Sequence, residues 1–315
     1  MKVHKLAYPE KPDTEGIGYS VAAGFFDGIH RGHQQVIGHA AEVARKEGLV
    51  PAVMTFDPHP SAVLGNKKDV TYITPLEQKL EILSDMGVGA VFVIRFSKEF
   101  ASLTPEEFIE CYIKGIGARH ITTGFDFTFG KFGKGTPDTL RQLANGAYGV
   151  SVVGKVEDGG EKVSSTRVRK LLAEGDVQGA AGLLGRPLMT DGIVIEGDKR
   201  GRTIGFPTAN VRPAEGACLP APGVYAVFYE SEGNRYPGVL NAGFRPTFKD
   251  PDKSELSVEV HLIGFEGDLY GRSARIRWME RIREERKFDG IGALKEQIGR
   301  DKDQAVKILQ EYAGS

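Results

Sequence analysis

The sequence predicts an α/β half followed by an all-β half, and three observations favour this division. Short apolar runs alternate with amphipathic helical stretches as far as about residue 184. Beyond that point, short strand candidates follow one another between Gly and Pro turns. The 315 residues are also enough for about two domains. We therefore expect domains over residues 1–184 and 185–315, with Gly185-Arg186-Pro187 at the boundary.

In the first half, five apolar runs are expected to be buried strands. They are Val21–Ala23, Val50–Phe56, Ala90–Ile94, His120–Thr123 and Val150–Val153. Four amphipathic stretches between them are expected to be helices: Gln34–Lys46, Pro75–Met86, Pro105–Lys114 and about Asp138–Asn145. This order implies βαβ units and a mainly parallel sheet, in which ligands bind beyond the carboxyl ends of the strands.

In the second half, the elements are closely spaced strands. Candidates are Ile193–Glu196, Val224–Tyr229, Tyr236–Asn241, Ser257–Ile263 and Ala274–Trp278. Such spacing favours a small antiparallel barrel. Two helical stretches accompany it, the bridge Ser165–Leu184 and the tail Ile291–Tyr312.

Composition is that of an ordinary globular protein, with 40% hydrophobic and 26% charged residues. The chain has 41 basic and 42 acidic residues, so its net charge is close to zero. No overall electrostatic field therefore favours a nucleic-acid or membrane partner. Cys111 and Cys218 are too few for a disulfide framework or a cysteine-based zinc site, and we expect a cytoplasmic protein. No signal peptide or membrane-length apolar run is visible. The sequence leaves self-association open.

The segment Gly24–His33 follows the first strand and carries glycines and two histidines. Glycine at a strand-to-helix turn lets the backbone approach a ligand closely, and the helix start that follows suits phosphate. The His30 and His33 imidazoles can share one helix face and meet one charged oxygen. Half of a metal site is the alternative, although no third ligand accompanies the pair. The segment therefore predicts a site that holds a nucleoside triphosphate.

Three more polar segments follow later strands of this half. Thr55–Pro60 closes the second strand, Gly124–Lys131 closes the fourth, and Ser164–Arg169 follows the fifth. Hydroxyl and N–H groups of the last segment can bind phosphate oxygens, and an arginine can add a bidentate pair. Simpler interpretations are a structural His59, a mere helix cap at Ser164–Thr166, and core packing for the alternating phenylalanines 125, 127 and 129.

A long glycine-rich, basic loop, residues 192–210, marks the second half. It lacks the Gly-Lys-Ser/Thr of a Walker loop, yet its N–H groups and cations suit a triphosphate. Thr208 and Asn210 offer neutral oxygens on one side of an extended chain, which suits Mg²⁺ already bound to phosphates. A solvated hairpin with Asn210 as a turn residue is the alternative. Glu259, in an alternating strand, either faces solvent or acts as a general base beside this loop.

The motifs of the first half carry a family resemblance. Gly24–His33 resembles the (G/H)xGH signature of the nucleotidyltransferase superfamily, and Ser164–Arg169 resembles its SSTxxR counterpart. Together with the segments at 55–60 and 124–131, they resemble the adenylyltransferase half of the bacterial bifunctional riboflavin kinase/FMN adenylyltransferases. The resemblance implies a Rossmann-like nucleotidyltransferase domain, in which the FMN phosphate attacks the α-phosphorus of ATP and pyrophosphate leaves.

The resemblance also implies roles for single residues. His30 and His33 would stabilise charge on the phosphates, and Arg167 would hold the β and γ groups. The ATP-binding residues of this half would be Gly24, Phe26, Asp27, Gly28, Ser164, Ser165 and Thr166. The flavin-binding residues would be Asp57, His59, Asp126 and Phe127.

The second half resembles a riboflavin kinase domain, on the motif Gly205–Asn210, the stretch Gly238–Phe248 and the run Asp268–Gly271. This resemblance implies that Glu259 activates the ribityl 5′-hydroxyl for attack on the γ-phosphate of ATP. Further implied ATP-binding residues are Gly197, Arg202, Gly205, Pro207, Thr208 and Asn210, of which Thr208 and Asn210 would hold Mg²⁺. Arg283 and Phe288 would bind flavin. Riboflavin, FMN and ATP are the implied small-molecule partners.

Two other functions compete with this interpretation. The first half could adenylylate another phosphate, such as a pantetheine or nicotinamide phosphate, with the barrel as a regulatory module. The combination of Thr208, Asn210 and Glu259 argues against it, because a binding module needs neither a metal loop nor a base. A flavin- or RNA-binding regulator is disfavoured by the balanced charge and the phosphate motifs.

Overall fold

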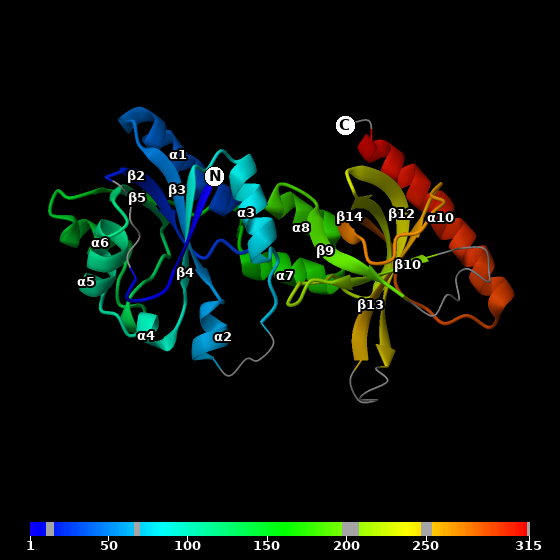
Figure 1. Cartoon of the computed structure of the whole chain (residues 1–315). Coiled ribbons are helices and arrows are strands. Elements are labelled where there is room, and N and C mark those ends of the chain that lie inside the picture. The colour runs from blue at the N-terminus through cyan, green and yellow to red at the C-terminus, as the bar shows by residue number, and fades with distance from the viewer. Residues whose placement is uncertain (11–15, 66–69, 197–207, 247–253, 314–315) are drawn as a thin grey trace. The chain divides into compact units, whose positions relative to one another are not determined.

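A sheet of six parallel strands forms the first half of the chain in the computed structural model, which describes residues 1–10, 16–65, 70–196, 208–246 and 254–313 (Figure 1). The strand order is β1-β4-β3-β2-β5-β6. The strands are β1 (Lys2–Leu6), β2 (Tyr19–Ala23), β3 (Val50–Asp57), β4 (Ala90–Arg95), β5 (Ala118–Gly124) and β6 (Gly149–Val153). The predicted parallel α/β half is confirmed.

Helices follow the strands and cover both faces of the sheet. They are α1 (Arg31–Glu47), α2 (Pro60–Leu64), α3 (Leu76–Asp85), α4 (Lys98–Ala101), α5 (Pro105–Phe108) and α6 (Pro137–Ala144). A π-helical turn, Ile109–Lys114, continues α5, and a 3₁₀ turn covers Lys131–Gly133. A short hairpin, β7 (Glu157–Asp158) and β8 (Glu161–Lys162), follows the sheet.

Side chains that alternate along the strands build two apolar layers. Val53 and Val91 belong to the layer that contains Leu83 of α3, whereas Met54 and Phe92 belong to the layer that contains Phe108 of α5. Figure 1 accordingly shows α3 on one side of the sheet and α5 with α6 on the other. Because both faces are buried, the strands need continuous apolar runs, which is why the sequence reveals them.

The strand β1 was not expected, since its sequence, Lys-Val-His-Lys-Leu, is mostly polar. It pairs with β4 at the edge of the sheet, where only Leu6 is buried. An edge strand that is mostly exposed carries little of the apolar signal on which sequence reasoning depends.

The second half contains a closed antiparallel barrel with the strand order β10-β13-β12-β11-β14-β9. The strands are β9 (Leu188–Ile195), β10 (Thr208–Pro213), β11 (Gly223–Ser231), β12 (Asn234–Pro246), β13 (Ser254–Leu262) and β14 (Ser273–Arg283). The helix α10 (Ile291–Ala313) packs Ala305, Ile308 and Leu309 against β11 and β12. The predicted barrel with a terminal helix is confirmed, and β10 is a strand that the sequence did not reveal.

The compact units divide between Ser165 and Thr166, earlier than the expected boundary at 184/185. The bridge is two helices, α7 (Ser165–Glu174) and α8 (Val177–Leu184). From Thr166 onward these helices belong to the second unit. The reason is that α8 packs on β9 and β14 and that Arg281 donates a hydrogen bond to the Glu174 carbonyl over 3.1 Å. These packing contacts, and not the glycine and proline residues at 185–187, therefore set the boundary between the two units.

Candidate functional site

Three of the predicted strand-end segments, Gly24–His33, Thr55–Pro60 and Gly124–Lys131, meet around one cavity of about 490 Å³ in the first unit. Its lining includes residues of both the turn after β2 and the loop after β5, among them Gly24, Phe26, His33, Asp126 and Phe127. Aromatic side chains from β3, α4 and α5 complete the wall. A mainly apolar cleft of this size, with a few convergent polar groups, is typical of a site for a small organic ligand.

The turn after β2 holds its two histidines in one fixed arrangement. His30 is the N-cap of α1, and its Nδ1 accepts a hydrogen bond from the His33 backbone N–H over 3.2 Å. The two rings stack with centroids 3.6 Å apart. The Phe26 ring meets His33 edge-on at 5.2 Å and folds back over Gly24, where a Cβ would lie 2.8 Å from it. Glycine is therefore required at position 24.

Both imidazoles are neutral at physiological pH. Burial lowers the pKa of His30 to about 4. Burial, and then the neighbouring His30 ring, lowers the pKa of His33 well below its usual range. Among the described residues, the buried Nδ1 of His33 has no hydrogen-bond partner. A polyanion bound beside the pair would favour protonation, so the histidines can supply both hydrogen bonds and charge when phosphate arrives.

The two phosphate motifs are joined directly. Ser165 Oγ donates to the backbone carbonyl of Asp27 over 2.8 Å. The Asp27 carboxylate is buried and accepts from the backbone N–H groups of Ile73 and Thr74, at 3.3 and 3.1 Å. Asp27 therefore holds the turn in place through its side chain. The hydroxyl of Ser165 is likewise committed to the turn rather than facing outward.

The other residues expected to bind ATP lie in and beside these motifs. Gly28 is in the turn with a φ of 85°, and the Phe26 ring belongs to the apolar core between the sheet and α1. Thr166 is exposed in the first turn of α7, and Ser164 and Arg167 are half-buried. Arg167 belongs to the second compact unit, two residues beyond Ser165 along the same helix.

The residues expected to bind flavin are only partly brought together. Asp126 and Phe127 line the cavity, and Asp126 forms an ion pair of 2.6 Å with Lys162. Asp57 instead lines a separate cavity of about 320 Å³. His59 caps α2, because its Nδ1 accepts from the Ser61 backbone N–H over 3.0 Å. The structural interpretation of His59 thus has a specific basis.

Two lysines near the histidines were missed by sequence reasoning. Lys162 of β8 lies 4.7 Å above the Phe125 ring and acts to lower the pKa of both histidines. Lys79 of α3 is buried against the turn itself. Lys162 could have been found from the sequence, because it lies two residues before Ser164. The sequence pattern of α3 gives no sign that Lys79 is buried.

The strand register of the barrel brings a second set of polar residues together. Glu259 of β13 lies opposite Asn210 of β10 on one side and opposite Asn241 of β12 on the other. Its neighbours Val258 and Val260 are buried, so Glu259 projects from the other face of the strand. Thr208 lies two residues from Asn210 on β10 and shares that face. The strand β10 excludes the turn interpretation of Asn210.

A further carboxylate reaches this group from the segment after β14. A Cβ at Gly243 would lie 2.5 Å from Glu285 Oε1 and 3.4 Å from Asn241 Nδ2. Glu285 therefore rests on β12 directly beside Asn241, where only glycine leaves room for it.

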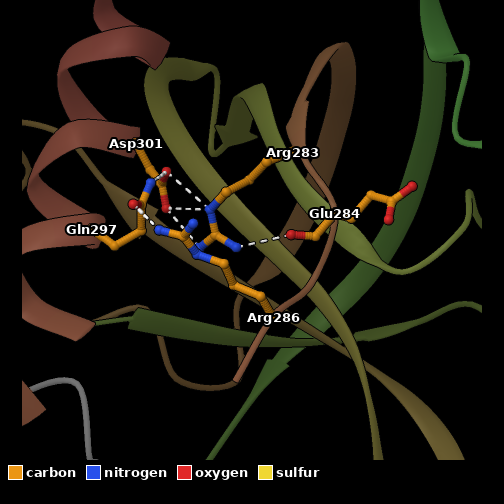
Figure 2. A network of polar contacts seen from close by, with 5 residues as sticks. All are labelled: Arg283, Glu284, Arg286, Gln297 and Asp301. Carbon is orange, nitrogen blue, oxygen red and sulfur yellow. Dashed lines mark hydrogen bonds and ion pairs between the residues drawn. The ribbon is translucent and has the colours of Figure 1, made fainter. Parts of the chain in front are cut away.

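The Arg283 side chain is held by α10 (Figure 2). Its Nε and Nη2 donate to the Asp301 carboxylate, with Nη2 at 2.8 Å from Oδ2, and its Nη1 donates to the Glu284 carbonyl. Gln297 donates to Asp301 Oδ1 over 2.6 Å. The Arg283 and Arg286 guanidinium carbons lie 5.5 and 5.0 Å from the Phe288 ring. Arg283 thus orients the segment that carries Phe288.

The donor set on β10 fits a magnesium ion that arrives with ATP. Thr208 and Asn210 present neutral oxygens, and no group of three His, Cys, Asp or Glu side chains suited to a metal occurs among the described residues. A hard cation with two neutral protein ligands needs phosphate oxygens to complete its shell. Gly197, Arg202, Gly205 and Pro207, expected to bind ATP, lie outside the described residues.

Comparison with known proteins gives consistent matches to both halves. The family model for FAD synthetase matches residues 13–167, and the model for riboflavin kinase matches residues 184–309. The bifunctional riboflavin kinase/FMN adenylyltransferase of Bacillus subtilis is 47% identical over 98% of both chains. The Escherichia coli K12 protein with the same description is 38% identical over 90% of both chains.

A solved structure also matches almost the whole chain. It is a crystal structure described as a macrolide-efflux protein from Streptococcus pneumoniae, with a TM-score of 0.87, 36% identity, and coverage of 95% of this chain and 97% of that one. Within the described part of the present chain, no helix is long and apolar enough to cross a membrane.

Proposed function

This chain belongs to the bifunctional riboflavin kinase/FMN adenylyltransferase family and carries both activities, and we propose that each half houses one of them. The first half transfers AMP from ATP to FMN, and the barrel phosphorylates riboflavin. This division is supported by two separate clusters of polar residues. One is the stacked His30–His33 pair at a parallel-sheet edge, and the other is the Asn210–Glu259–Asn241 row on the barrel.

Adenylyl transfer needs positioning and charge stabilisation rather than a protein nucleophile. An oxygen of the FMN phosphate forms a bond to the α-phosphorus of ATP, while the bond to the bridging oxygen breaks and pyrophosphate leaves. His30, whose Nδ1 already accepts from His33, has its proton on Nε2 when neutral and can donate it to a phosphate oxygen. The backbone N–H groups of Ser164 and Ser165, which are linked to Asp27 through the Ser165 hydroxyl, would face the leaving phosphates.

Phosphorylation of riboflavin needs a base for the 5′-hydroxyl of the ribityl chain. Glu259 is the carboxylate best placed for it, because the register sets it beside Asn210, and through Asn210 beside Thr208. It takes the hydroxyl proton as the oxygen attacks the γ-phosphorus and ADP leaves. Mg²⁺ held by Thr208 and Asn210 would neutralise charge on the phosphates. Phe288, whose ring contacts the Arg283 and Arg286 guanidinium groups, supplies an aromatic side chain for contact with the flavin ring.

The experiment is to incubate the chain with riboflavin, ATP and Mg²⁺ and to separate the flavins by chromatography. The wild type should form FMN and then FAD. His33→Ala should form FMN but no FAD, and Glu259→Ala should form FAD only when FMN is supplied. Loss of both activities in His33→Ala, or near-normal phosphorylation by Glu259→Ala, would overturn the division.

Two matched substitutions serve as controls. His39 is a second histidine of α1 that does not line the cavity formed by the described residues. Glu266 is an exposed carboxylate in the loop after β13. Alanine at either position should leave both activities unchanged.

A further inference from the structure

Lys79 is a buried amine in direct contact with the phosphate-binding turn. It projects from α3 with 2% of its surface exposed. Its Nζ donates to the Phe25 backbone carbonyl over 2.7 Å and to Thr55 Oγ1 over 3.3 Å, and it lies 4.4 Å from the centre of the Phe25 ring. Thr55 Oγ1 donates to the same carbonyl over 2.9 Å. The Phe25 carbonyl is therefore clamped from two sides.

The hydrogen-bond acceptors of this ammonium are neutral. Asp27 and Asp57 attract it from a greater distance, and His33 on α1 is the titratable group that its charge acts upon. The hydrogen bonds that Nζ makes to described residues go to a carbonyl and a hydroxyl oxygen, neither of which is a carboxylate. Burial lowers the pKa of Lys79 to about 8. A buried cation without a contacting counter-ion costs stability, which a purely structural role does not require.

The clamp connects Lys79 to the histidine pair through the backbone. Phe25 precedes Phe26, which has a φ of 55°, a conformation that a bulky side chain rarely adopts. That conformation places the Phe26 ring edge-on against His33, which stacks on His30. Fixing the Phe25 carbonyl therefore fixes the backbone just before the strained residue, and with it the orientation of both imidazoles.

We propose that Lys79 is a positioning residue for adenylyl transfer, which holds the Gly24–His33 turn through the Phe25 carbonyl and adds a buried positive charge behind the triphosphate site. The proposal rests on the function proposed above for the first half. It assigns to α3, an element without any recognised motif, a part in orienting the histidines. The charge also favours the neutral form of His33 before substrate binds.

The first test is Lys79→Met, which keeps the apolar stem and removes both the donor and the charge. FAD formation from supplied FMN should fall by about 100-fold, the loss typical of misplaced catalytic groups. Phosphorylation of riboflavin in the same samples should be unchanged. Amide hydrogen exchange in β2 should stay as slow as in the wild type, because removing an unpaired buried charge does not weaken the fold.

Lys46→Met is the matched control, since Lys46 is an exposed lysine of α1. It should leave all three measurements unchanged. FAD formation by Lys79→Met within about threefold of the wild type would overturn the proposal. So would a loss of FAD formation that is accompanied by faster exchange throughout β2, because that result indicates a structural lysine. If the wild type makes no FAD at all, the proposed function fails instead.

The second test is the pH profile of adenylyl transfer. Because the charged form is the active one, wild-type kcat/KM should fall as pH rises through about 8, the pKa of Lys79. Lys79→Met, measured at higher enzyme concentration, should lack this fall. The same fall in both proteins would overturn the assigned role of the charge.

Discussion

The His30 Nδ1 atom accepts a hydrogen bond from the His33 backbone N–H while the two imidazole rings stack 3.6 Å apart. This one contact therefore caps α1 and also sets the tautomer of His30 in the candidate site, since a neutral His30 must carry its proton on Nε2. Because burial keeps both rings neutral, the pair is ready to donate hydrogen bonds and gains charge only when a polyanion approaches.

The histidine pair should make the first unit sensitive to acid. The folded pKa of His30 is about 4 against 6.5 in the unfolded chain, so the unfolded state binds the proton first as pH falls. Stability that is fully present above pH 6.5 is then lost as pH falls toward 4, by up to about 3 kcal/mol. His33 contributes in the same direction. Hydrogen exchange in β2 between pH 7 and 4.5 measures the loss.

His30→Asn is the control for this prediction, because asparagine keeps a capping oxygen and does not titrate. Its first unit should lose less stability over the same pH interval. An equal loss in both proteins would show that other groups carry the acid sensitivity.

The Arg283–Asp301 pair should stabilise the second unit and the segment that carries Phe288. Asp301→Ala leaves the guanidinium without its carboxylate, and since Arg283 retains 19% side-chain exposure we expect the lower end of the usual range, about 3 kcal/mol. Urea unfolding followed by the fluorescence of Trp278, which is the single tryptophan and is fully buried in the barrel, measures it. The KM for riboflavin should rise because Phe288 is no longer held.

Arg300→Ala removes a surface ion pair of the same helix, in which both side chains are more than half exposed. It should change the free energy of unfolding by less than about 1 kcal/mol and leave KM unchanged. FAD formation from supplied FMN should survive Asp301→Ala. Its loss would mean that the network supports more than the kinase.

Gly243→Ala should displace Glu285 without unfolding the barrel. The added Cβ would lie 2.5 Å from Glu285 Oε1, the far end of an exposed and flexible side chain that can move. We expect little change in the free energy of unfolding and a severalfold higher KM for riboflavin, measured by initial rates of FMN formation.

Glu285→Gln keeps the shape of that side chain and removes only its charge. If the carboxylate charge contributes to riboflavin binding, this substitution should raise KM in the same way as Gly243→Ala. Gly182→Ala, at a helical glycine with open space around it, should change neither KM nor stability. A normal KM in both Gly243→Ala and Glu285→Gln would remove Glu285 from the flavin site.

The sequence by itself determined the fold class, most of the strands and helices, and the motifs that are proposed to bind phosphate. Parallel strands buried on both faces require apolar runs, and phosphate turns require glycine with polar residues close together in sequence, so both leave local signals. The edge strand Lys2–Leu6 and the strand Thr208–Pro213 were not predicted, because neither contains a continuous apolar run.

The tertiary structure alone decided which side chains meet. The register of three strands sets Glu259 between Asn210 and Asn241. The packing of helices buries Lys79 against the Gly24–His33 turn and Asp301 against Arg283. Asp57, which the sequence grouped with Asp126, faces a different cavity. Burial and register depend on residues far apart in the chain, whereas a periodic pattern reports only on near neighbours, and this is why the sequence identified the motifs but not their supports.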